Sequence, residues 1–131
     1  MGLLVKKLTM PFGVEFSDVY FKINRLSYND EDGKLYFAGA FYVNQAARQD
    51  GLQPLENGIL CEAIDLPDKT VNLYEFVYNY IKEKAIEVYN MTPIEITEHN
   101  NAVEIERQTD ENARYNLINP SYALFYESKD C

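Results

Sequence analysis

The sequence has no tryptophan, one histidine and two cysteines among its 131 residues. Cys61 and Cys131 do not make a disulfide framework, and no C-x-x-C pair or Cys/His cluster indicates a metal site. Cys61 falls in the apolar run 58–64, so we expect a buried thiol. His99 falls in an expected polar turn with no partner at a fixed spacing, so an exposed turn residue is favoured over a catalytic one. We expect neither a cofactor nor a metal.

Long apolar runs and basic residues are also scarce. No run approaches the roughly 18 residues that span a bilayer, and no signal peptide is recognisable, so we expect no membrane insertion and a cytoplasmic protein. Twelve basic residues stand against 21 acidic ones, and the net charge of -9 repels phosphate backbones, so nucleic acid is not an expected partner. The same charge leaves an alternative open, an acidic decoy that occupies the basic groove of a DNA-binding protein.

Catalytic patterns are missing as well. The serines lie in no nucleophile elbow, and no glycine-rich phosphate loop is present. The pairs Glu95/Glu104 and Glu98/Glu106 fall on the expected solvent side of a hairpin, where charges protect an edge rather than perform acid–base chemistry. We therefore expect that the protein is not an enzyme.

Aromatic residues are abundant, with 11 tyrosines and 7 phenylalanines. Such residues favour pleated, half-buried surfaces, so we expect a largely aromatic core. Hydrophobic residues make up 47% and charged residues 25% of the chain, which is ordinary for a globular protein. The length suits a single domain over residues 1–131.

Residues 18–44 carry the strongest local signal, a β-hairpin. Segments 19–24 and 35–43 alternate in polarity, and the polar run 29–33 between them has turn chemistry. Closing that turn pairs Phe21 with Phe41 on an apolar face. The opposite face then carries tyrosines around a shallow alanine floor, and we take it as the candidate interface: Tyr20, Leu26, Tyr36, Ala38, Ala40 and Tyr42. Either a helix or a partner subunit can cover this face.

The remaining elements alternate between strand and helix patterns. Residues 3–10 and 59–64 suit short strands, whereas 44–58 suit a surface connection with one helical turn. Residues 73–89 have helical periodicity after Asn72, with Glu75 three residues later in a capping-box arrangement. Segments 94–97 and 103–106 predict a second hairpin, and 113–117 and 122–126 a third. The expected fold is α+β, an antiparallel β-sandwich with one long helix packed against it.

The order of these features resembles that of small proteins encoded in the tail and baseplate region of tailed phages of Gram-positive bacteria. The similar segments are 10–13 (MPFG), 19–23 (VYFKI), 41–48 (FYVNQAAR), 72–82 (NLYEFVYNYIK) and the terminal Asp-Cys. The chain departs from that pattern in its longer region 92–129. No catalytic residue belongs to the pattern.

The resemblance implies a non-enzymatic virion protein, or a tail or baseplate accessory protein, that acts by self-association and protein docking. Its partners would be itself and other phage tail proteins, with a host-surface saccharide as a sub-case. It would reside in the host cytoplasm during assembly and then in the virion. With the net charge of -9, the alternative is a soluble acidic inhibitor or decoy that acts on a host protein in the infected cell. The tyrosine and alanine face further predicts a closed, symmetric homo-oligomer in which Ala40→Arg separates the subunits without unfolding them.

Overall fold

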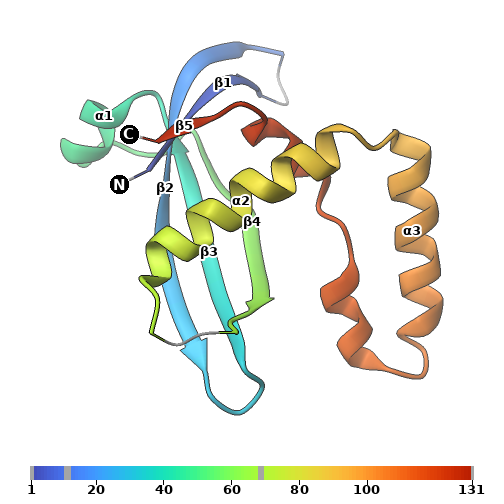
Figure 1. Ribbon diagram of the computed structural model, residues 1–131. Coiled ribbons are helices and arrows are strands. Elements are labelled where there is room, and N and C mark those ends of the chain that lie inside the picture. The colour runs from blue at the N-terminus through green and yellow to red at the C-terminus, as the bar shows by residue number, and fades with distance from the viewer. Residues whose placement is uncertain (1, 11–12, 68–69, 131) are drawn as a thin grey trace.

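A computed structural model describes residues 2–10, 13–67 and 70–130. Its centre is one five-stranded sheet in which every neighbouring pair is antiparallel (Figure 1). The strand order is β4-β3-β2-β1-β5. The strands are β1 (Leu3–Thr9), β2 (Glu15–Asn29), β3 (Lys34–Tyr42), β4 (Glu56–Asp65) and β5 (Lys129–Asp130). The expected strands in the first half of the chain are therefore confirmed.

Helix α2 (Leu73–Tyr89) crosses one face of the sheet (Figure 1). The Asn72 side chain accepts a hydrogen bond from the Glu75 amide, as the sequence predicts for the start of this helix. Helix α2 buries two stripes of side chains against the strands. These stripes include Val77, Tyr78 and Ile81. We call the sheet face under α2 the core face and the opposite one the outer face. None of the helices in the described part of the chain is long and apolar enough to cross a membrane.

Aromatic rings fill the centre of the core face. Phe21 of β2 lies 5.1 Å from Phe41 of β3 and 4.7 Å from Phe125, measured between ring centroids. Phe125 belongs to the 3₁₀ helix η2 (Pro120–Phe125), which packs beside α2. A Cβ atom at Gly39 would lie 2.2 Å from the Phe21 ring, so only glycine leaves that ring its place. The expected aromatic core is confirmed.

The pairing of β2 with β3 follows the predicted register only in part. Tyr20–Tyr42, Phe21–Phe41 and their neighbours as far as Ile23–Gly39 are paired as expected. A β-bulge at Asn24 then shifts the register by one residue, so Leu26 faces Phe37 rather than Tyr36. The shift has a simple cause: it turns the apolar Leu26 toward the core face, where it packs against the hydrophobic cluster.

Both expected hairpins of the last third are wrong. Residues 94–106 lie in a second long helix, α3 (Pro93–Glu106). It begins with a complete capping box, in which the Thr92 side chain accepts from the Glu95 amide and the Glu95 carboxylate accepts from the Thr92 amide. Residues 113–126 lie largely in η1 (Glu111–Asn116) and η2.

The expected β-sandwich is not confirmed. The described strands form a single open sheet, and α2 and η2 rather than a second sheet cover its core face. The coarser expectation, a mixed fold of an antiparallel sheet with packed helices, holds. Helix α3 and η1 run side by side and project beyond β4, the edge strand (Figure 1). We call residues 93–116 the arm.

Candidate docking groove on the outer face of the sheet

Three residues of the candidate interface are buried. Tyr20, Ala40 and Tyr42 form a small cluster on the outer face, with exposed fractions of 3%, 0% and 9%. The Tyr20 ring lies against Gly2, where a Cβ atom would approach it to 2.5 Å. The short helix α1 (Gln45–Gln49) follows β3 directly, and its Ala47 is also buried. The exposed patch that we expected around Ala40 is therefore absent, so Ala40→Arg should unfold the chain.

The other three residues of the expected interface separate between the two faces. Leu26 packs against the core cluster because of the bulge at Asn24, although part of it also lines the groove on the outer face. Tyr36 and Ala38 lie on the outer face, partly exposed, and both line a groove of about 1070 Å³. The structure thus keeps only the Ala38 part of the predicted alanine floor open to solvent, whereas Ala40 is buried.

Small side chains form the floor of this groove. Ser27 of β2, Ala38 of β3, and Cys61 and Ala63 of β4 occupy neighbouring positions, since Ser27 is paired with Tyr36, Ala38 with Cys61 and Tyr36 with Ala63. Cys61 is exposed, so the expectation of a buried thiol is wrong. The apolar run 58–64 suggested a strand that is covered on both faces, but β4 is an edge strand and buries only one face. Leu60 therefore lies inside and Cys61 lies outside.

One wall of the groove belongs to the arm. A chain of hydrogen bonds joins the arm to the sheet across this wall: Arg114 Nη2 to the Tyr115 hydroxyl (2.8 Å), the Tyr115 hydroxyl to the Tyr36 hydroxyl (3.3 Å), and Tyr36 to the Asp32 carboxylate (2.5 Å). The carboxylate and the guanidinium fix the direction, because one can only accept and the other can only donate. Each hydroxyl therefore donates toward Asp32. That hydrogen bond raises the pKa of Tyr36 above its ordinary value.

Two cations flank the ring of Tyr115. The Lys34 ammonium lies 4.4 Å from the ring centroid and the Arg114 guanidinium carbon lies 4.8 Å from it. Lys34 also pairs with Asp65 at 2.8 Å. These contacts fix one edge of the arm against β3 and β4.

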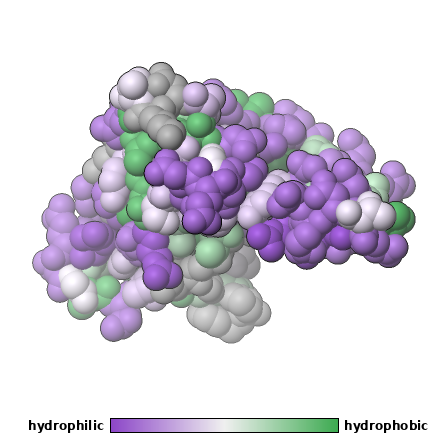
Figure 2. Space-filling model, turned by 90° about the horizontal axis from the view of Figure 1, so that it is seen from below, coloured by the Kyte–Doolittle hydropathy of each residue, from purple (hydrophilic) through white to green (hydrophobic). Residues whose placement is uncertain are grey.

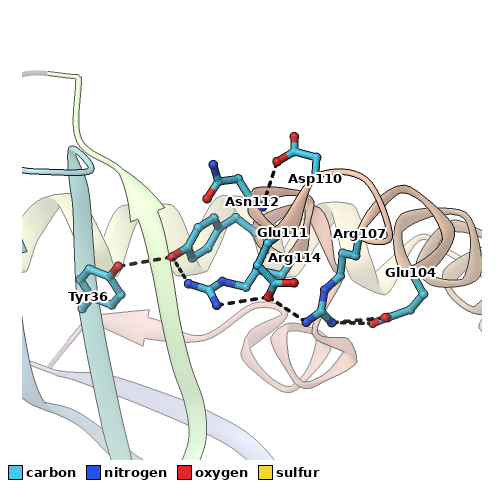
Figure 3. Close-up of polar contacts among 8 residues, drawn as sticks. Tyr36, Glu104, Arg107, Asp110, Glu111, Asn112 and Arg114 are labelled. Atoms are coloured by element: carbon cyan, nitrogen blue, oxygen red, sulfur yellow. Dashed lines mark hydrogen bonds and ion pairs between the residues drawn. The ribbon is translucent and has the colours of Figure 1, made fainter.

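Arginines gather at this groove. The chain has four, and three of them line it: Arg25, Arg107 and Arg114. Figure 3 shows the guanidinium groups of Arg107 and Arg114 on either side of the Glu111 carboxylate, at 3.2 and 3.3 Å, with Arg107 also bound to Glu104. Arg25 differs, since it is exposed on the outer face and has no acidic partner within the described ranges.

The arm is also held at its base. The Asn100 side chain donates to the Ile118 carbonyl (3.0 Å) and accepts from the Ile118 amide (2.8 Å), so one amide satisfies both backbone groups of Ile118. His99 Nε2 lies 2.8 Å from the Asn116 carbonyl, to which it donates. His99 is exposed as expected, but on a helix rather than in a turn.

A second hollow, of about 600 Å³, lies between β4, α2 and the arm. It contains Glu62, a half-buried carboxyl on the core face of β4, together with Tyr80 and Tyr122, whose ring centroids are 6.0 Å apart. Burial raises the pKa of Glu62 above its ordinary value. No three His, Cys, Asp or Glu side chains of the described residues are grouped as ligands for a metal ion.

Sequence reasoning missed most of the groove. Arg25 and the wall residues Arg107, Arg114 and Tyr115 were assigned no role, because the expected strands put them on separate hairpins. One signal was readable: Leu26 follows Ile23 by three positions, and this spacing breaks a period of two at the position of the bulge. No protein-family model, curated protein or solved structure matches this chain.

Proposed function

We propose that the chain is a non-enzymatic docking protein of the tail or baseplate region of a tailed phage, which acts by self-association and by binding other tail proteins. The resemblance of segments 10–13, 19–23, 41–48 and 72–82 to such proteins supports the phage assignment. The groove on the outer face carries the docking assignment. It joins a floor of small side chains to walls of tyrosine and arginine.

This combination of side chains suits a protein partner. Tyrosine and arginine are enriched at interfaces, because each buries apolar area while it keeps a polar group for hydrogen bonds. Small floor residues such as Ala38 and Ala63 let a partner approach the backbone of the sheet. The contacts of Tyr115 with Tyr36 and Lys34 hold one wall in place before a partner binds, which reduces the entropy lost on docking.

The docking assignment is tested by closing the groove. Ala38→Trp fills the floor, whereas Ala46→Trp puts the same side chain on an exposed position of α1 outside the groove. In a phage that lacks the gene, we expect the wild-type protein and Ala46→Trp to restore particle assembly and Ala38→Trp to fail. Circular dichroism should show that both variants fold. If the two variants restored assembly equally, the groove would not be the docking site.

The phage assignment is tested by mass spectrometry of purified virions and of assembly intermediates from the strain that carries the gene. We expect peptides of this chain in at least one of the two preparations. Their absence from both would refute a structural or assembly role.

A further inference from the structure

Helix α3 of the arm has an inward side, which packs against the rest of the chain, and an outward side. Its inward stripe, Ile96, Asn100, Val103 and Arg107, has helical spacing, and Val103 is only 4% exposed. The rest of the helix faces solvent. Figure 2, which views the molecule from below, shows that the surface of the arm on the right is mostly hydrophilic.

The outward side of α3 is acidic with two exposed isoleucines. Four glutamates and no lysine or arginine lie between Pro93 and Glu106. Ile94 and Ile105 are 69% and 68% exposed, and they lie on one side of the helix because eleven residues make about three turns. Glu98, one turn after Ile94, lies on the same side and is exposed. This side of the helix therefore combines a carboxylate with apolar side chains.

The groove has the complementary character. Its floor offers the cation of Arg25, which has no acidic partner among the described residues, beside Ala38 and Ala63. Leu117 adds apolar surface at the wall. In the part of the chain that the structure describes, three arginines and one carboxyl, that of Glu62, line the groove, so an acidic segment meets less repulsion there than the net charge of -9 alone implies. Arg107 and Arg114 are already bound to Glu111, so Arg25 is the cation that remains for a partner among the described residues that line the groove.

We propose that the groove of one copy receives the outward side of α3 from a second copy, with Glu98 of the incoming helix beside Arg25. The inference rests on the self-association in the proposed function and names the surfaces that associate. Each copy has one groove and one α3. Reciprocal exchange therefore closes a two-fold symmetric dimer and leaves no open end for further copies.

Charge reversal with sedimentation velocity tests this pairing. We expect the wild type to dimerise, and Arg25→Glu and Glu98→Lys each to weaken the dimer at least about tenfold, since each puts like charges together in both halves of the interface. Arg48→Glu is the matched control, because it makes the same charge change at the one arginine outside the groove, and it should dimerise like the wild type.

Mixing provides the decisive measurement. When Arg25→Glu is mixed with Glu98→Lys, both halves of the heterodimer bring opposite charges together, and the double variant R25E/E98K does the same in its homodimer. We expect dimers to return in both cases. Thermal melts of each variant show whether a lost dimer reflects a lost fold instead.

Other outcomes would overturn the inference and leave the binding of other tail proteins to the particle-assembly test. A wild-type monomer at every concentration would exclude the exchange. A dimer that tolerates both reversals, or one that Arg48→Glu weakens equally, would place self-association on another surface or make it a general charge effect.

Discussion

The hydroxyl of Tyr78 accepts a hydrogen bond from the backbone amide of Ile23 at 2.8 Å, inside the core. Ile23 is the last residue of β2 before the bulge at Asn24, and among the described residues the pairing of β1 with β2 extends from Thr9–Glu15 to Leu3–Phe21. A buried amide needs a partner, and here a side chain of α2 provides it. The bond therefore couples the position of the helix to the irregular point of the strand.

Removing that acceptor should destabilise the fold. We expect Tyr78→Phe to cost about 1–3 kcal/mol in the free energy of unfolding, because the Ile23 amide would stay buried without a partner. Tyr74→Phe is the control, since Tyr74 is 44% exposed, and should stay within about 0.5 kcal/mol of the wild type. Urea denaturation measures both. Equal costs for the two variants would mean that the hydrogen bond contributes nothing.

Asn100 should govern the opening of the arm. Asn100→Ala leaves both backbone groups of Ile118 without their side-chain partner, so we expect faster amide hydrogen exchange at Ile118 and along the arm. The strands of the sheet should keep their protection. Asn101→Ala, at the exposed next position of the helix, should exchange like the wild type. Unchanged protection at Ile118 in Asn100→Ala would contradict the role of Asn100.

The half-buried Glu62 should make stability depend on pH. Its pKa in the folded chain is raised by burial, so folding favours the protonated form, and this favourable contribution is lost as the pH rises above the unfolded value. Glu62→Gln, which is neutral at every pH, should therefore raise the melting temperature at pH 7 and lose that advantage below about pH 4. Glu106→Gln on the exposed arm serves as the control. An advantage that is constant with pH would refute the assignment.

Gly39 should tolerate no side chain. In Gly39→Ala the new Cβ atom would lie 2.2 Å from the Phe21 ring and 2.9 Å from the Lys22 carbonyl oxygen, and the backbone contact remains even if the ring moves. We expect a loss of about 1–3 kcal/mol in unfolding free energy, as for other overpacked cores. Phe21→Leu in the same chain should recover part of the additional cost. A double-mutant cycle by urea denaturation measures that coupling.

The sequence predicts elements well where local chemistry and burial agree. The hairpin around 29–33 and the helix after Asn72 have turn or cap residues at the ends of clear apolar periods, and both are present. Residues 94–106 show the opposite case. Their β-branched residues alternate with glutamates as in a strand, and the inward stripe of the helix contains Asn100 and Arg107, so its period does not show in apolar residues alone. The capping box at Thr92 was the readable local signal for a helix.

The candidate site could be predicted only in part for a related reason. Tyr36 and Ala38 were placed on the correct face by the alternation of β3. The cover over Ala40 and the approach of Tyr115 to Tyr36 depend on contacts between residues far apart in the sequence. Contacts of that kind produce no periodic pattern in the sequence from which they could be predicted.

The strand order also bears on how the chain reaches its native state. Strands β1 to β4 are each paired with a neighbour in sequence, whereas β5 pairs with β1 through Leu3–Asp130, from opposite ends of the described chain. Closing a longer loop costs more entropy, so we expect the four-stranded meander to form early and residues 120–130 to dock late. Phe125 would then reach Phe21 and Phe41 only in the final step, and the rate of that step would set how long an incomplete aromatic core is exposed during folding.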